Sequence, residues 1–348
     1  MQEQQSNKKI WLNIVMVVVI ILAGLTIIGS LHDFELVLEK LKTMKLPYYL
    51  GALGLSLVGL VLITLSNLIV QRAINKDLPM KTGFFIQSVE PFFNGITPFS
   101  SGAQPFQVYF YRKHHLKPEQ ATSIVLVVSI LYQIACVALS LVGLILFFNQ
   151  ITSSLGLSFI FLMIGIFINA FVLVLLFLMA YVKGFKNLIY KLLMLLSKIK
   201  FLKKKMEQLM EKSDKFVHNF QKGVKFLFTK KRVFIGSLST KFAALFITYL
   251  TTILIAKALG ATLTTSENFY LVFTSLLAAT SMFFVPLPGA SGGTEAIFAG
   301  MIGAMFESPE IAISLMILWR VATYYFGMLY GFVSYLILQK MKVKEVWI

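Results

Sequence analysis

Cysteine is almost missing from this sequence, since Cys136 is the single one among 348 residues. One thiol excludes an intramolecular disulfide and any metal site built from several cysteines. The four histidines lack metal-ligand spacing; His114 and His115 lie in a basic stretch, where a solvated pair is expected rather than a pair of ligands. The sequence therefore predicts neither a metal site nor a cofactor.

Charge is also scarce. Only 14% of the residues are charged, against roughly 25% in soluble domains. Hydrophobic residues make up 57% of the chain, and the mean hydropathy is +0.80. Several uncharged runs reach the ~20 residues that a membrane-spanning helix needs. The composition predicts an all-α polytopic membrane protein, with residues 1–348 forming a single membrane domain.

Familiar catalytic motifs are missing as well. The metalloprotease motif HExxH, the Walker loop GxxxxGK[ST] and a paired His/Asp acid–base set do not occur. A GxSxG hydrolase motif is not expected either. We therefore predict no catalytic residue and favour a function that is not enzymatic.

The net charge is +17, and most of it comes from one stretch. Residues 183–232 contain fifteen Lys and Arg against three acids. A basic segment beside membrane spans indicates the cytoplasmic side, and the leucine spacing at residues 188–196 predicts an amphipathic helix on the inner leaflet. A nucleic-acid surface is the alternative.

Six hydrophobic runs are long enough to cross a bilayer, and the basic residues between them set their direction. Lys8 and Lys9 precede the first run, and Lys340, Lys342 and Lys344 follow the last, which places both termini in the cytoplasm. The predicted spans are residues 10–31, 48–70, 121–148, 155–182, 233–256 and 311–338. Residues 149–154 are expected to form a short outer loop.

Two further apolar segments, residues 83–111 and 268–306, are interrupted by proline and glycine. The flanking charges predict that each segment enters and leaves on one side, the first cytoplasmic and the second external. Such broken segments are tolerated at membrane depth where protein or a cavity surrounds them. The backbone breaks are expected at Pro98, Gly102, Pro286, Pro288, Gly289, Gly292 and Gly293.

Residues 10–148 and 155–338 each combine spans with one broken segment, in opposite orientations. The two broken segments share a weak Pro-x-x-Ser-Gly-small-polar pattern at residues 98–104 and 288–294. Inverted repeats with paired, interrupted segments indicate a transporter site near the midplane of the membrane. Chance similarity between two Gly/Pro-rich loops is the alternative.

Ionisable residues inside the membrane are the first functional candidates, because a charge there costs ~2.5–3.5 kcal/mol even on insertion scales. Glu90 lies in the first broken segment, Glu295 follows the second glycine cluster, and Arg320 lies in mid-span. We expect Arg320 to bind a lipid phosphate bidentately. Glu295 would orient it, exchange a proton or meet a cationic headgroup; a purely structural Arg320–Glu295 pair is the alternative. Lys241 is expected to snorkel to the inner interface.

Polar side chains of the broken segments are expected to line a common cavity. Their alternative role is hydrogen bonding to the interrupted backbone. They are Asn94, Thr97, Ser100, Ser101 and Gln104 in the first segment, and Ser291 and Thr294 in the second.

The broken segments resemble those of a known family. Residues 93–105 (FNGITPFSSGAQP) are similar to its TPF-x-(S/T)-G-(G/A)-Q-P element, and residues 286–295 (PLPGASGGTE) to its P-x-P-G-x-x-G-x-x-E element. Arg320 resembles an arginine of the following span. The family is the flippase-like membrane domain shared by the lysylphosphatidylglycerol synthase transmembrane region, the N-terminal domain of multiple peptide resistance factors and their stand-alone relatives.

The resemblance implies a bacterial cell-membrane protein that translocates an anionic phospholipid, an aminoacyl-phospholipid or a glycolipid. In the bifunctional relatives a cytosolic domain transfers lysine from lysyl-tRNA to phosphatidylglycerol, and the membrane domain moves the product. This chain ends ten residues after its last predicted span, so we expect no such catalytic domain. The alternatives are phosphatidylglycerol lysyltransferase activity and an auxiliary subunit that recruits a lipid synthase or glycosyltransferase.

Overall fold

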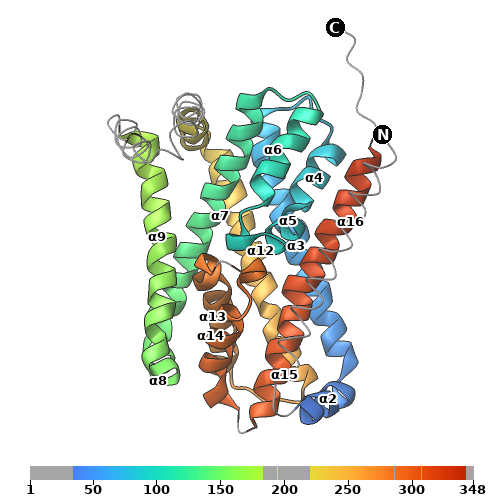
Figure 1. The fold of residues 1–348 in the computed structure, drawn as a ribbon, viewed down its shortest axis with the longest axis vertical. Coiled ribbons are helices and arrows are strands. Elements are labelled where there is room, and N and C mark those ends of the chain that lie inside the picture. The colour runs from blue at the N-terminus through green and yellow to red at the C-terminus, as the bar shows by residue number, and fades with distance from the viewer. Residues whose placement is uncertain (1–33, 183–193, 195–219, 286, 307, 342–348) are drawn as a thin grey trace.

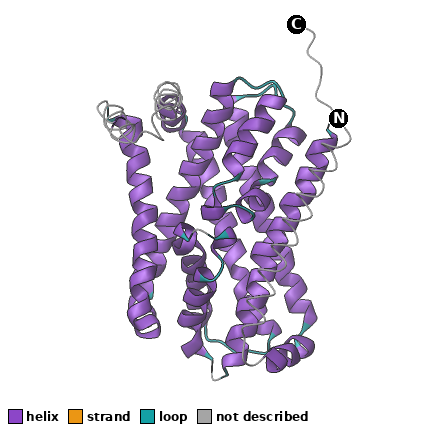
Figure 2. Cartoon of the chain, in the orientation of Figure 1, coloured by secondary structure: helices purple, strands orange, loops and turns teal. Residues whose placement is uncertain are grey.

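The computed structural model describes residues 34–182, 194, 220–285, 287–306 and 308–341. Across these residues the regular elements are helices (Figure 2). The predicted span 10–31 lies outside the described residues, as does most of the basic segment 183–232. In the described end of that segment, residues 220–229 are helical.

Five long apolar helical stretches match five of the six predicted spans. Their lengths and composition confirm the prediction of an all-α, multi-pass membrane protein. Residues 149–154, expected as a short loop, are helical instead. The stretches are α3 (Leu46–Ile74), α7 (Pro118–Leu146), α8 (Phe148–Leu155) with α9 (Phe159–Tyr181), α12 (Lys231–Ala258), and α15 (Pro309–Arg320) with α16 (Phe326–Lys340).

The helices α3 and α12 form the closest pair of the bundle. Small residues let their backbones approach: a Cβ added at Gly59 would lie 2.0 Å from the Thr248 hydroxyl oxygen. About two helical turns further along α3, the Ser66 hydroxyl lies 2.7 Å from the Ser237 carbonyl oxygen, and the Ser237 hydroxyl donates back to the Ser66 carbonyl at 2.9 Å. These interhelical contacts make the pair a firm frame for the rest of the bundle.

The first broken segment starts and ends at one end of the bundle, which we call the α6 end (Figure 1). Its chain reverses at η1, where Phe99 and Ser100 have φ values of 57° and 48°. The segment consists of α4 (Met80–Ser88), α5 (Glu90–Gly95), η1 (Pro98–Ser100) and α6 (Ala103–Lys113).

The second broken segment enters from the opposite end, where α2 (Phe34–Thr43) also lies, and reverses at η4 (Figure 1). The turns η1 and η4 contact each other in the middle of the bundle. That the two halves are inverted repeats stays a prediction. The segment consists of α13 (Thr265–Ser281), η3 (Met282–Phe284), η4 (Pro288–Ala290), α14 (Gly293–Ile302) and η5 (Gly303–Met305).

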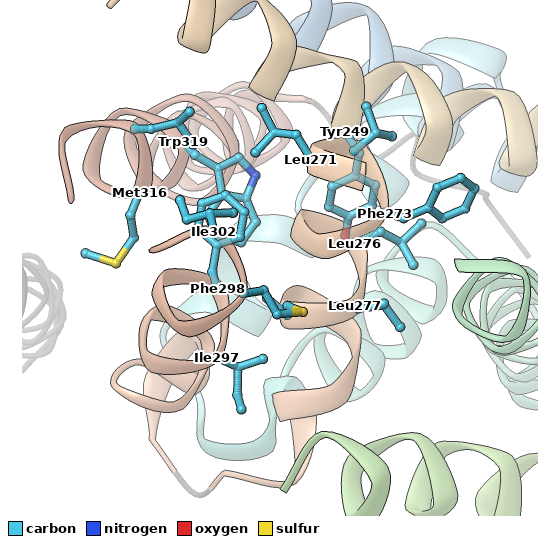
Figure 3. Close-up of a cluster of buried hydrophobic side chains, with 14 of the residues drawn as sticks. Tyr249, Leu271, Phe273, Leu276, Leu277, Ile297, Phe298, Ile302, Met316 and Trp319 are labelled. Atoms are coloured by element: carbon cyan, nitrogen blue, oxygen red, sulfur yellow. The ribbon is translucent and has the colours of Figure 1, made fainter. Parts of the chain in front are cut away.

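The largest buried cluster packs α13, α14 and α15 together (Figure 3). At its centre the rings of Phe298 and Trp319 lie 4.4 Å apart between centroids. Phe298 follows Glu295 by one helical turn, and Trp319 directly precedes Arg320. This aromatic contact therefore fixes, relative to each other, the two helices that carry these charged residues.

Candidate functional site

Glu295 and Arg320 form an ion pair in the interior of the bundle. The Arg320 Nε atom lies 2.6 Å from the Glu295 Oε1 atom, and each residue is less than a tenth exposed. The Nε–H bond is not aligned with the carboxylate, so the contact is a close charge pair rather than a straight hydrogen bond. The structure thus brings together two of the three ionisable residues that the sequence singled out, and the third, Glu90, lies in a separate cluster.

Glu295 is held by the turn that starts α14. Its Oε2 atom accepts a hydrogen bond of 2.7 Å from the backbone N–H of Gly292. Gly292 has φ +84°, a conformation that favours glycine. The carboxylate therefore caps the N-terminus of α14, where the helix dipole favours a negative charge, and its Oε1 atom remains directed at Arg320.

Arg320 is the last residue of α15, and the π-helical turn η6 (Val321–Tyr325) follows it. Its Nη2 atom donates to the carbonyl of Gly289 at 3.0 Å and contacts the Ser291 hydroxyl oxygen at 3.5 Å. Its guanidinium lies 4.4 Å from the centre of the Tyr324 ring. A π-helical turn inside a helix is frequent at functional sites, and here it places Tyr324 against the guanidinium.

Tyr324 also connects the two broken segments. Its hydroxyl donates to the carbonyl of Gly95 at 2.9 Å, and its ring covers Gly289, where an added Cβ would lie 2.3 Å from ring atoms. Gly289 has φ +62°, so both the backbone and the ring require glycine there. The arginine, its aromatic neighbour and both broken segments therefore meet at one place.

The predicted polar residues of the first segment mainly support its backbone. The Thr97 hydroxyl donates to the Phe93 carbonyl at 2.8 Å and accepts from the Gly102 N–H at 2.9 Å. The Asn94 side chain accepts from the Ala103 N–H at 3.0 Å. The backbone role that the sequence left open thus applies to Thr97 and Asn94.

Other predicted positions are placed as follows. On the first segment, Ser101 is exposed and Gln104 is partly buried at the start of α6. On the second, the Ser291 hydroxyl donates to the Pro288 carbonyl at 2.9 Å and the Thr294 hydroxyl to the Ala290 carbonyl at 3.2 Å. Among the predicted breaks, Pro98 begins η1, Pro288 begins η4 and Gly293 begins α14. At Gly102, an added Cβ would lie 2.4 Å from the Thr97 side chain. Pro286 lies outside the described residues.

Residues 289–293 match the GxSxG pattern of hydrolase nucleophiles, so the expectation that this motif does not occur is wrong. That pattern works on a strand–turn–helix unit with a histidine partner. Here Ser291 lies between η4 and α14, its hydroxyl donates to a carbonyl, and its oxygen faces the Arg320 guanidinium. These surroundings differ from those of a hydrolase nucleophile.

Glu90 belongs to a second charged cluster. The Asn67 amide donates to the Glu90 Oε2 atom at 3.3 Å, and the Lys241 ammonium donates to the Asn67 carbonyl oxygen. Lys241 is 1% exposed, so the expectation that it snorkels to the interface is wrong. Its side chain points into the α3–α12 contact, where an amide partner was available.

Sequence reasoning did not single out Tyr324 or Asn67. Tyr324 follows Arg320 by four residues, a spacing that places two side chains on one helix face. Asn67 is an amide inside an apolar run, and that isolated polar residue could have marked it as a candidate. Among the described residues, no group of three His, Cys, Asp or Glu side chains is placed to hold a metal ion.

A cavity of about 370 Å³ opens at the end of the bundle opposite α6. Its lining includes Lys45, Lys257 and Asn268, from the ends of α3, α12 and α13. The cavity is therefore distant along the bundle from the ion pair, which is closed in by its neighbours.

The comparisons with known proteins agree with this architecture. The family model described as the lysylphosphatidylglycerol synthase TM region matches residues 11–331. A search of curated proteins gave no match. The family match supports a membrane function related to lipids. By this match over most of its length, the chain belongs to the lysylphosphatidylglycerol synthase transmembrane-region family.

Proposed function

We propose that this protein translocates a lipid or lipid-linked substrate across the membrane, with an anionic phospholipid, an aminoacyl-phospholipid or a glycolipid as the cargo. The observation that carries the proposal is the buried Glu295–Arg320 pair where the two broken segments meet. Buried charges inside membrane proteins are expensive and typically mark substrate or ion pathways. Paired, interrupted segments typically hold transporter substrates near the midplane.

The chemistry of the site suits a phosphate. An arginine guanidinium forms paired hydrogen bonds with phosphate oxygens, as it does with a carboxylate. A headgroup phosphate therefore replaces the Glu295 carboxylate at Arg320 and leaves the guanidinium compensated throughout the exchange. The released Glu295 carboxylate then pairs with a cationic part of the headgroup, such as the amine of an aminoacyl-phospholipid.

The two broken segments supply the means of alternating access. Each enters from a different end of the bundle, and their turns η1 and η4 meet beside the ion pair. Withdrawal of one segment would open the site toward one end, while the other segment kept the opposite end closed. The positive φ values at Gly289 and Gly292 place adaptable backbone next to the moving parts.

The direction of insertion follows from the basic residues at the α6 end. Arg112 and Lys113 end α6, Lys231 begins α12 and Lys340 ends α16. Positive charge near spans favours the cytoplasmic side. We propose that this end faces the cytoplasm of a bacterial cell, with both chain termini there.

A dithionite-quench assay in liposomes tests the proposal. Headgroup-labelled phosphatidylglycerol, a labelled glycolipid and labelled phosphatidylcholine are compared for wild type, for Glu295→Ala and for the exposed-site control Glu119→Ala. We expect wild type and Glu119→Ala to expose inner-leaflet label of at least one anionic or glycosylated lipid, and Glu295→Ala to lose most of that activity. Identical traces for wild type and protein-free liposomes, with all three lipids, would contradict translocation.

A further inference from the structure

The cluster of Glu90, Asn67 and Lys241 has no role in the site described so far. It joins three elements, because Glu90 begins α5, Asn67 lies in α3 and Lys241 lies in α12. Lys241 is ten residues into α12, about 15 Å of helix from its start. A buried ammonium at such depth requires compensation, and Asn67 lies between it and the Glu90 carboxylate.

The two ends of the cluster differ in exposure and in the elements that carry them. Lys241 and Asn67 are each 1% exposed and belong to the tightly packed α3–α12 pair. Glu90 retains accessible surface and sits at the junction of α4 and α5 in the first broken segment. Glu90 is therefore the accessible member of the cluster, and the member carried by the segment that the proposed transport cycle moves.

The helix α5 connects this cluster to the ion pair. Glu90 is its first residue and Gly95 its last, a separation of about 8 Å along the axis. The Gly95 carbonyl accepts from Tyr324, whose ring lies on the Arg320 guanidinium. A rigid element thus touches both charged groups.

We propose that Glu90, Asn67 and Lys241 form a proton-binding site that is thermodynamically coupled to the binding of an anionic headgroup at Arg320. The inference rests on the proposed function. With a carboxylate at Glu90 the cluster is neutral; when a proton from water binds that carboxylate, the cluster carries one uncompensated positive charge on Lys241. A buried, uncompensated charge is costly, and an anion inside the bundle offsets it. Proton and anion therefore favour each other's binding, by reciprocal linkage.

Among the described residues, few other titratable groups face the cluster. Tyr111 on α6 and Tyr132 on α7 face Glu90, and Cys136 on α7 faces Lys241. The remaining neighbours contribute uncharged groups: Gln87 and Ser88 on α4, and Tyr330 on α16, which contacts Ser88. Glu90 is thus the single carboxylate among these neighbours.

Calorimetry on the purified full chain tests the coupling. Short-chain phosphatidylglycerol is titrated into the protein in two buffers of different ionisation enthalpy, which gives the number of protons taken up on binding. Short-chain phosphatidylcholine is the uncharged-ligand comparison. For wild type we expect about one proton per bound phosphatidylglycerol, an affinity that changes up to about tenfold per pH unit, and no uptake with phosphatidylcholine.

The variants decide the assignment. Glu90→Gln and the neutral double variant Glu90→Gln/Lys241→Gln are expected to bind phosphatidylglycerol without proton uptake, whereas Glu119→Gln and Lys257→Gln behave as wild type. Lipid binding without uptake in wild type, or equal uptake in Glu90→Gln, overturns this inference and leaves translocation standing. If no form of the protein binds or moves an anionic lipid, both this inference and the proposed function fail.

Discussion

The Tyr324 hydroxyl donates to the Gly95 carbonyl oxygen at 2.9 Å, although 229 residues separate them in the sequence. Gly95 ends α5 in the first broken segment, and Tyr324 lies in the π-helical turn directly after Arg320. The same ring covers Gly289 of the second broken segment. One side chain therefore holds both broken segments and the arginine together in this closed arrangement.

Replacement of Tyr324 by phenylalanine tests this link. Tyr324→Phe keeps the ring over Arg320 and Gly289 but leaves the Gly95 carbonyl without its donor. The loss of a buried partner costs about 1–3 kcal/mol, so the apparent melting temperature in detergent should fall. Tyr325→Phe, one position along, is the control and should change it less. Equal melting temperatures for Tyr324→Phe and wild type would show that the hydrogen bond contributes nothing.

Gly289 should tolerate no side chain while Tyr324 is present. Gly289→Ala adds left-handed backbone strain of about 1–2 kcal/mol and overlap with the ring, which costs a further ~1–3 kcal/mol. In a Tyr324→Ala background the overlap disappears and only the strain remains. Thermal unfolding of the four proteins of this double-mutant cycle measures the coupling. Additive effects of the two substitutions would argue against the contact.

Separation of the ion pair should destabilise the protein more than removal of both charges. Glu295→Gln leaves the Arg320 guanidinium buried without a counter-charge, which typically costs about 3–5 kcal/mol. The neutral double variant Glu295→Gln/Arg320→Gln avoids that cost and should unfold at a higher temperature than Glu295→Gln alone. The prediction fails if the double variant is the less stable protein.

The close approach of α3 and α12 predicts how glycine substitutions in α3 change the stability of the protein. Gly59→Ala places a methyl group 2.0 Å from the Thr248 hydroxyl oxygen and 3.2 Å from the Ala244 carbonyl, so a loss of about 1–3 kcal/mol is expected. Gly54→Ala, on the same helix, meets nothing within 4 Å and should stabilise the helix by about 0.5–1 kcal/mol. Melting temperatures that move in the same direction for both variants would be inconsistent with this packing.

The architecture was largely predictable from the sequence, because long uncharged runs and flanking basic residues follow simple rules of membrane insertion. Four of the five described spans lie within about four residues of their predicted positions, whereas the span predicted at residues 155–182 begins earlier, at Phe148. The pairing of Glu295 with Arg320 was also within reach, since two isolated charges in apolar surroundings need compensation. The hydrogen-bond partners of Arg320 depend on the turn at Gly289. No local sequence pattern specifies that this turn contacts Tyr324, 35 positions later.

Lys241 and Tyr324 show where sequence reasoning ends. Snorkelling was the reasonable expectation for a lone lysine in a span. The Lys241 side chain is buried instead, because Asn67, 174 residues earlier, faces it across the α3–α12 contact. Tyr324 lies in the π-helical turn that follows Arg320. Residues 321–325 (VATYY) contain neither proline nor glycine, so the sequence does not predict this turn. Tertiary packing, rather than local preference, placed both side chains.

The most direct test of the account is the translocation rate of Arg320→Lys in the dithionite assay, measured beside the exposed-site control Arg112→Lys. A lysine keeps the positive charge but loses the planar pair of donors that suits a phosphate. The account predicts that Arg112→Lys moves the anionic lipid at the wild-type rate, whereas Arg320→Lys loses at least about tenfold, the equivalent of one charge-assisted hydrogen bond. Wild-type translocation by a correctly folded Arg320→Lys would contradict a headgroup-binding role for this arginine.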